Sequence, residues 1–158
     1  MRKFEVVKKE ALKFPALETK LPERADNRSA GYDFYSKEEK ILNPGEFHTF
    51  WTDVKAQMYY DNVLKLYPRS GNGVKKGLVL RNSTGIIDPS YYGNMSNDGN
   101  IGICLVNTGT EVVFIAEGDR IAQGVFNRYL ITDDDRFLKG KEKSVERTGG
   151  FGSSGNWF

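Results

Sequence analysis

The amino-acid sequence predicts an all-β protein built as a sandwich or a barrel. Short runs rich in β-branched and aromatic residues recur along the chain, and clusters of Gly, Asn, Asp, Ser and Pro separate them. Many short strands at this spacing are typical of sandwiches and barrels rather than of alternating βαβ units. No segment keeps a sustained helical period. A single short helix in the first half of the chain is still compatible with this pattern.

The strands are expected to follow one another, each bounded by turn residues. FEVV opens the series, and YDFY and FHTFWTDV come next with an Asn-Pro-Gly turn between them. VLKLY leads into a glycine-rich turn, and NTG and EGD separate the last three runs. Alternating apolar residues between such signals indicate half-buried strands. The predicted strands are residues 4–7, 32–35, 47–54, 63–67, 101–106, 111–115 and 120–126.

Length and charge favour one soluble domain. The chain has 158 residues, and a chain of this size can bury roughly 68–70% of its unfolded surface. Its 23 basic and 21 acidic residues leave a net charge of +2, which is too small to indicate direct binding of nucleic acid. No apolar run approaches the length of a membrane span, so no membrane partner is expected.

The scarcity of cysteine and histidine narrows the chemistry. Cys104 is the single cysteine, so an internal disulfide is excluded and a reducing compartment is indicated. We therefore expect a cytoplasmic protein, in the host cytoplasm if a phage encodes it. Because His48 is the single histidine, the sequence argues against a zinc site and against a Cys–His or Ser–His nucleophilic pair.

The composition changes after Tyr129, where the chain becomes highly charged and then ends in RTGGFGSSGNWF. Such a segment cannot bury enough apolar surface to order itself. We expect a β domain at residues 1–135 and a flexible arm at 136–158. A plain glycine-serine linker would explain this composition, but a Phe among glycines with an Arg upstream also suits a base and its phosphates.

Residues 85–93, GIIDPSYYG, are the most informative stretch. Their pattern predicts a strand that leads into a turn, with Asp88 next to Ile86 and Ile87. A partly desolvated carboxylate of this kind can act as a general base near neutral pH. Taken alone, Asp88 is better explained as an ordinary turn residue before proline.

Other segments carry weaker signals for binding a polyanion. Residues 68–77, PRSGNGVKKG, combine the Arg69 guanidinium and the Ser70 hydroxyl with glycines that let backbone amides face an oxyanion. This segment lacks the spacing of a Walker A loop. Gln123, in GDRIAQ, can donate to a phosphate oxygen, and Asp33, in AGYDF, can hold a metal through water or cap a turn.

Five segments together resemble the ordered motifs of the trimeric deoxyuridine triphosphatases (dUTPases). They are AGYDF, PRSG, GIIDPSYYG, GDRIAQ, and Arg147 followed by GFGSSG, and the likeness covers residues from about 21 to 155. Two stretches, LKLYPRS and the extended hairpin after Tyr91, are most similar to phage or prophage members from Gram-positive hosts.

The resemblance implies a jelly-roll-like β-protein that assembles as a homotrimer with three shared active sites. It implies hydrolysis of dUTP to dUMP and pyrophosphate with Mg²⁺, which limits uracil incorporation into DNA and supplies dUMP. Asp88 would be the base that activates the water attacking the α-phosphorus, and Asp33 would contact the metal through water. The protein would act mainly by positioning and charge neutralisation.

The resemblance also assigns the substrate contacts. Phosphate oxygens would be held by Arg69, Ser70, Gly71 and Gln123. The uracil edge would be read by Asn82 and by the backbone around Ile86, Ile87 and Gly102. Tyr91 would lie under the deoxyribose and exclude a 2′-hydroxyl. The arm would close last, with Phe151 over the base and Arg147, Gly152, Ser153 and Ser154 around the γ-phosphate.

The sequence departs from the family pattern at two places, and two other functions are alternatives to dUTP hydrolysis. The spacing from Arg147 to Phe151 is one residue shorter than is common, and residues 94–99 lengthen the recognition hairpin. A dCTP deaminase needs a glutamate where this chain has Cys104. A regulatory protein that uses the same scaffold to capture a host partner is the second alternative, with residues 94–99 as its candidate surface.

Overall fold

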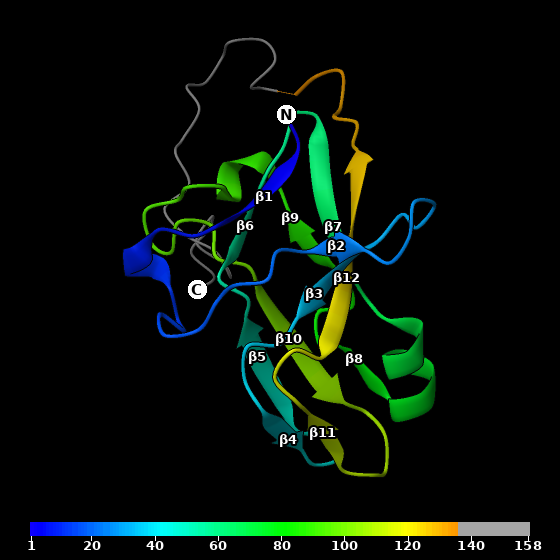
Figure 1. Cartoon of the computed structure of the whole chain (residues 1–158). Helices are drawn as coiled ribbons and strands as arrows, with labels where there is room; N and C mark the ends of the chain where they lie inside the picture. The colour runs from blue at the N-terminus through cyan, green and yellow to red at the C-terminus, as the bar shows by residue number, and fades with distance from the viewer. Residues whose placement is uncertain (136–158) are drawn as a thin grey trace, which may run out of the picture.

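The computed structural model describes residues 1–135, which contain twelve β-strands and three short helices (Figure 1). The predicted all-β class is therefore confirmed. The strands are β1 (Lys3–Val6), β2 (Glu23–Arg24), β3 (Tyr32–Tyr35), β4 (Lys40–Leu42), β5 (Phe47–Trp51), β6 (Val54–Gln57), β7 (Asn62–Pro68), β8 (Leu78–Leu80), β9 (Gly85–Ile87), β10 (Gly102–Asn107), β11 (Val113–Ile115) and β12 (Arg120–Arg128). The helices are η1 (Lys9–Ala11), η2 (Gly71–Lys75) and η3 (Pro89–Tyr91).

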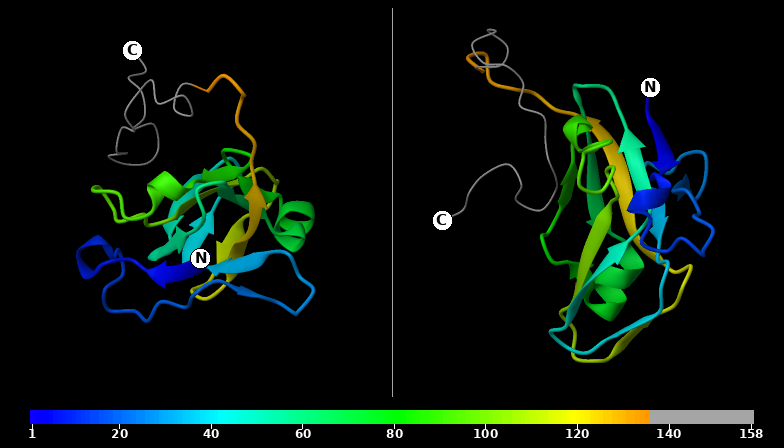
Figure 2. Two further views of the ribbon diagram at one scale, coloured as in Figure 1. Left: turned by 90° about the horizontal axis from the view of Figure 1, so that it is seen from above. Right: turned by 90° about the vertical axis from the view of Figure 1, so that its left-hand side faces the viewer.

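The strands form two larger sheets and two ribbons. The larger sheets have the orders β2-β3-β12-β7-β9 and β5-β10-β8, and the ribbons are β1-β6 and β11-β4. All of the pairings are antiparallel. Viewed from above, the strands surround a common interior (Figure 2).

One apolar cluster fills the interior between the sheets. Phe34 of β3 and Leu64 and Leu66 of β7 contribute to it from the five-stranded sheet, and Ile103 and Leu105 of β10 contribute from the other. Residues between them point the other way, because successive side chains of a strand face opposite sides of the sheet. On β10, for example, Cys104 and Val106 are only half-buried. This alternation is the pattern from which the strands were predicted.

The single strand predicted at residues 47–54 is wrong. It is divided into β5 and β6 at Asp53, which has a φ of 56°. The fully buried Asp53 carboxylate accepts hydrogen bonds from the backbone amides of Lys13, at 2.8 Å, and Phe14, at 3.0 Å. The Lys37 ammonium lies 3.2 Å from the same carboxylate. These contacts with a distant segment hold Asp53 in a conformation that ends the strand.

Short elements account for the other differences. β2, β4 and β8 have only two or three residues each, too few to show an alternating pattern. The glycine-rich turn expected after Arg69 is the short helix η2. The strand expected at 111–115 begins at Val113 instead. Among residues 1–135, the structure contains no helix that is long and apolar enough to cross a membrane.

A buried ion pair joins β6 to the segment before β10. The Lys55 ammonium donates to Asp98 Oδ2 at 2.7 Å, and the Lys8 amide donates to the same oxygen at 2.7 Å. Burial raises the pKa of the Asp98 carboxyl, but these two hydrogen bonds outweigh it and hold the pKa below its ordinary value of 3.8. Asp98 therefore stabilises the folded chain in its charged form.

Replacing Asp98 with Asn is expected to lower the free energy of unfolding at pH 7 by about 3 kcal/mol, because the buried Lys55 ammonium loses its partner. Since the folded pKa of Asp98 is depressed, its contribution is complete above the ordinary aspartate pKa and is lost as the pH falls through the folded value. Urea denaturation of both proteins should show a difference that shrinks below a pH of about 4. A difference that stays constant with pH would contradict this account, and the exposed Glu10→Gln variant is the control.

Candidate active site

Two predicted phosphate contacts, Arg69 and Gln123, meet the predicted metal contact Asp33 at one end of the five-stranded sheet. Gln123 of β12 lies in register with Asp33 of β3 on one side and with Tyr67 of β7 on the other. Arg69, which follows β7, places its Nε 2.8 Å from Asp33 Oδ1. The Gln123 side chain donates to the Pro68 carbonyl at 3.2 Å. Segments that lie far apart in the sequence thus converge because β12 pairs with both of its neighbours.

Arg120 also belongs to this cluster, although the sequence did not predict it. Its Nη1 lies 3.4 Å from Asp33 Oδ2, so two guanidinium groups flank one buried carboxylate. The sequence offered a signal in GDRIAQ, but proximity along the chain suggested Asp119 as the partner of Arg120. The pairing of β12 with β3 instead brings the Arg120 side chain to Asp33.

A polar hollow of about 170 Å³ opens beside this cluster. Arg69, Arg120 and Lys76 bring positive charge to its lining, against the single carboxylate of Asp119. Asn72 also lines it and donates to the Arg120 carbonyl at 3.1 Å. Guanidinium groups suit phosphate because their planar N–H donors match its oxygens. The hollow therefore has the charge and donors of a polyphosphate site.

The segments that border the hollow supply further donors. Ser70 and Gly71 are exposed where η2 begins, and the Ser70 side chain makes no capping hydrogen bond with the helix. Gly31, which precedes β3, lies against the Gln123 side chain. A Cβ at residue 31 would come within 2.4 Å of Gln123 Oε1. A larger residue at this position of the AGYDF segment would therefore displace the end of the Gln123 side chain.

Asp88 lies elsewhere, at the start of η3. Its Oδ1 accepts hydrogen bonds from the Ser90 amide at 3.1 Å and the Ser90 hydroxyl at 2.6 Å. The half-buried carboxylate borders a mainly apolar hollow of about 680 Å³ whose lining includes Ile86, Pro89 and Tyr129. Ser90 fixes the orientation of one carboxylate oxygen, and the apolar lining reduces its exposure to water.

The predicted uracil-reading segment is a hairpin whose two strands separate. β8 pairs with β10, β9 pairs with β7, and each strand ends its own sheet in the described chain. The turn between them carries Asn82, and Ser83 has a φ of 63°. Edge strands present backbone N–H and C=O groups that the sheet does not use. This hairpin can therefore offer main-chain donors and acceptors to a flat ring placed between its strands.

The remaining predicted residues of this segment lie close to the hairpin. The Arg81 amide donates to the Cys104 carbonyl at 2.9 Å, which holds the turn beside the first residues of β10, where Gly102 lies. Tyr91 is buried, and its hydroxyl donates to the Asn100 carbonyl at 2.7 Å. Asn82, Tyr91 and Gly102 are thus gathered at one end of the molecule.

A large distance separates Asp88 from the phosphate cluster. Ile87 pairs with Leu64 near one end of β7, whereas Arg69 follows directly after Pro68 at the other end. A strand rises about 3.3 Å per residue, so the Cα atoms of Asp88 and Arg69 lie roughly 17–20 Å apart. This separation is longer than a triphosphate chain. Within one chain the predicted base and phosphate donors do not face the same reacting atom.

The arm residues predicted to complete the site lie outside the described part of the chain. They are Arg147, Phe151, Gly152, Ser153 and Ser154. The division into a domain at residues 1–135 and an arm at 136–158 remains a prediction as well.

Comparison with known proteins decides the family. A family model described as dUTPase matches residues 18–155. The chain belongs to the dUTPase family. A curated relative from Lactococcus lactis subsp. lactis (strain IL1403), named deoxyuridine 5′-triphosphate nucleotidohydrolase, is 43% identical over 155 residues and covers 98% of each chain. The expectation of an enzyme of this family is confirmed.

Solved structures of dUTPases share the fold. The dUTPase from Streptococcus mutans is 38% identical, with a TM-score of 0.71 over 82% of this chain and 98% of that chain. A mutant dUTPase from phage phi11 of S. aureus, described with a structural Mg(II) ion, is 26% identical, with a TM-score of 0.66 over 92% and 97% of the two chains. The jelly-roll-like fold is thereby confirmed, and phage dUTPases are among its structural relatives.

One further phage dUTPase bears on regulation. The enzyme of Staphylococcus bacteriophage 80alpha is 25% identical, with a TM-score of 0.66 over 92% of this chain and 96% of that chain. The description of that structure states that phage dUTPases control transfer of virulence genes.

Proposed function

We propose that the protein hydrolyses dUTP to dUMP and pyrophosphate in active sites shared between subunits of a homotrimer. The observation that carries the shared site is the separation of roughly 17–20 Å between Asp88 and Arg69 along β7. Two copies of the chain bring these groups to one substrate if the Asp88 end of one faces the Arg69 end of the next. Cyclic symmetry then repeats the contact and closes the assembly.

In this proposal Asp88 is the general base. Its carboxylate, oriented by Ser90, takes a proton from a water molecule as that water attacks the α-phosphorus. The new bond joins the water oxygen to the α-phosphorus, and the bond from the α-phosphorus to the oxygen that bridges it to the β-phosphorus breaks. Pyrophosphate leaves with that bridging oxygen, and the proton stays on Asp88 until the products depart.

The phosphate cluster of a neighbouring subunit neutralises the leaving group. Arg69, just after β7, and Gln123 of β12 hold phosphate oxygens, and Ser70 and the Gly71 amide approach from the start of η2. Asp33 positions the Arg69 guanidinium by binding its Nε at 2.8 Å. Arg120 adds a second cation to the same hollow. Fixed donors of this kind stabilise charge that develops in the transition state.

Asp33 also suits an outer contact to Mg²⁺. Residues 1–135 contain no cluster of three or more acidic, His or Cys side chains that could cage a metal. Magnesium usually keeps several waters and binds substrate phosphates with one or two carboxylates. Although both Asp33 oxygens contact arginines, a carboxylate has about four acceptor positions, which leaves room for a metal-bound water. Magnesium would supply charge neutralisation on the triphosphate.

Base selection rests on the separated strands β8 and β9. Uracil presents a donor between two acceptors, and cytosine reverses part of this pattern. Main-chain groups of Ile86, Ile87 and Gly102, together with the Asn82 amide, would match uracil and leave unpaired groups with cytosine. Tyr91 would lie under the deoxyribose and exclude a 2′-hydroxyl. The arm at 136–158 would close the site, and Cys104 suits a cytoplasmic location.

Substrate preference tests this function directly. Pyrophosphate release is expected to be fastest with dUTP and much slower with dTTP, dCTP and UTP, measured at equal enzyme concentration with excess Mg²⁺. Equal rates for the four nucleotides would remove the proposed function, and ammonia released from dCTP would identify a deaminase instead. Sedimentation should show a trimer, and a monomer that is fully active would exclude the shared site.

A regulatory role is the second candidate, because of the likeness to the phage 80alpha enzyme. Its candidate docking surface is the loop at residues 94–99. Asn94 and Asp98 are buried, and Met95, 86% exposed, is the main apolar group that the loop presents to solvent. A regulatory effect that survives Asp88→Asn would support a role that is separate from catalysis.

A further inference from the structure

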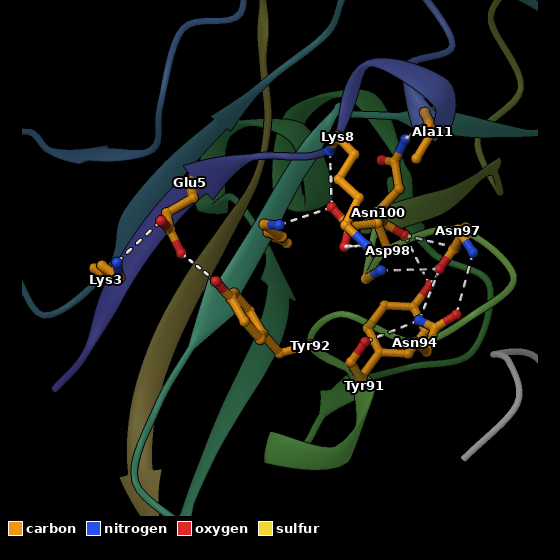
Figure 3. A network of polar contacts seen from close by, with 12 residues as sticks. Lys3, Glu5, Lys8, Ala11, Tyr91, Tyr92, Asn94, Asn97, Asp98 and Asn100 are labelled. Carbon is orange, nitrogen blue, oxygen red and sulfur yellow. Dashed lines mark hydrogen bonds and ion pairs between the residues drawn. The ribbon is translucent and has the colours of Figure 1, made fainter. Parts of the chain in front are cut away.

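The Tyr91 hydroxyl is held from two sides by the loop that follows it (Figure 3). It donates to the Asn100 carbonyl at 2.7 Å and accepts from the Asn97 side-chain amide at 2.8 Å. A phenol with one donor and one acceptor contact at its tip cannot tilt or slide without losing one of them. The loop therefore fixes the position of the ring.

Asn97 is itself oriented by its surroundings. Its Oδ1 accepts hydrogen bonds from the Asn94 side chain at 2.8 Å and from the Gly99 amide at 3.1 Å. Its Nδ2 therefore points toward Tyr91 and the Asn100 carbonyl, which it contacts at 3.2 Å. One half of this side chain closes the loop, and the other half reaches the tyrosine.

The loop backbone is closely fitted to Tyr91. Gly99 has a φ of 87°, and a Cβ there would come within 2.8 Å of the Tyr91 carbonyl. Asp98 also has a positive φ, of 56°, which Asp tolerates better than most residues. The Asn94 side chain donates to the Tyr91 carbonyl at 2.8 Å. Backbone and hydroxyl of the tyrosine are thus held by one loop.

The body of the protein anchors this loop through the two residues after Asn97. Asp98 binds the Lys55 ammonium of β6 and the Lys8 amide before η1. The fully buried Asn100 binds Asp53 Oδ1 at 2.9 Å and the Ala11 carbonyl at 3.1 Å. The adjacent Tyr92 hydroxyl donates to Glu5 of β1, which raises the pKa of Tyr92 to about 12. Asn97 therefore acts from a rigid base.

We propose that Asn97 is a positioning residue for sugar discrimination, because its amide locks the Tyr91 ring against the deoxyribose. This inference rests on the proposed function. A ring that cannot yield excludes a 2′-hydroxyl by contact. Without the Asn97 donor, the ring can move aside and admit UTP. Residues 94–99 thus serve specificity for the sugar.

The test compares the ratio of kcat/KM for dUTP to kcat/KM for UTP. Asn97→Asp keeps the acceptor that closes the loop and removes the donor to Tyr91. A single hydrogen bond implies a fall in this ratio of about fivefold. Tyr91→Phe is expected to give a similar fall. If both residues act through one contact, the ratio of the double variant should be about as low as that of either single variant. Independent effects would instead lower the ratio by about 25-fold.

A loss of folding alone would lower both substrates equally, so the ratio separates positioning from stability. The matched control is Met95→Ala in the same loop, which should leave the ratio unchanged because Met95 is 86% exposed. An unchanged ratio in Asn97→Asp overturns the inference while the proposed function stands. A wild-type protein without preference for dUTP over UTP overturns both. If Asn97→Asp does not fold, an unchanged ratio in Tyr91→Phe overturns the inference instead.

Discussion

Replacing Asp88 with Asn is expected to lower kcat for dUTP hydrolysis by about 10²–10⁴-fold, the usual contribution of a positioned general base. Asparagine has the same shape and can still accept the hydrogen bonds from Ser90 that orient residue 88. It cannot take a proton from water. The measurement is pyrophosphate release under single-turnover conditions, so that product release does not mask the chemical step.

Binding should survive this substitution. The affinity for a non-hydrolysable α,β-imido analogue of dUTP, measured by calorimetry, is expected to match that of the wild-type protein. The exposed Glu10→Gln variant loses a carboxylate away from the contacts described for the site and is the control for charge. Full activity in Asp88→Asn would rule out Asp88 as the base. Loss of both binding and activity would instead indicate a structural role.

Mixing two inactive variants is expected to restore activity. Arg69→Gln removes a guanidinium contact to phosphate and should lower kcat by about 10²–10³-fold. Subunits with Asp88→Asn keep Arg69, and subunits with Arg69→Gln keep Asp88. If each site takes these residues from different chains, random assembly from equal amounts gives about one quarter of the wild-type activity. The structural basis is the separation along β7. Leu64 pairs with Ile87, the residue before Asp88, whereas Arg69 follows the other end of the strand.

The outcome distinguishes shared sites from sites within one chain. The two variants are unfolded together in urea, refolded and assayed, with each variant refolded alone as the control. Recovery only in the mixture supports shared sites. No recovery, with sedimentation showing that the mixture assembles, would mean that one chain supplies both residues. Thermal melting checks that the Arg69→Gln variant folds. We expect it to fold, because the Asp33 carboxylate keeps Arg120 as a partner at 3.4 Å.

The alternating pattern of the sequence predicted the longer strands well. β7, β10 and β12 show apolar residues on one face, and burial of that face is what keeps each strand in register. The pattern failed at Asp53, because amides from Lys13 and Phe14 decide the break between β5 and β6. Contacts across some 40 residues leave no local signal.

For the site residues too, the local sequence predicted some features and distant contacts decided others. The types and order of Asp33, Arg69 and Gln123 could be recognised in the sequence, because they stand in motifs that resemble those of the dUTPase family. Their mutual contacts could not, since these depend on the register in which β12 pairs with β3 and β7. The role of Arg120 was missed for this reason. The role proposed for Asn97 could not be foreseen, because its contact with Tyr91 depends on the fold of the loop.

By itself, the sequence determined the fold class and the family and predicted a set of candidate chemical groups, because strand periodicity and motif order are local properties of the chain. Tertiary structure alone decided where those groups lie. The pairing of β7 with β9 sets Asp88 far from Arg69, and the strands β8 and β9 separate because each belongs to a different sheet. Register and sheet order are long-range choices fixed by burial of the common core, and no short segment encodes them.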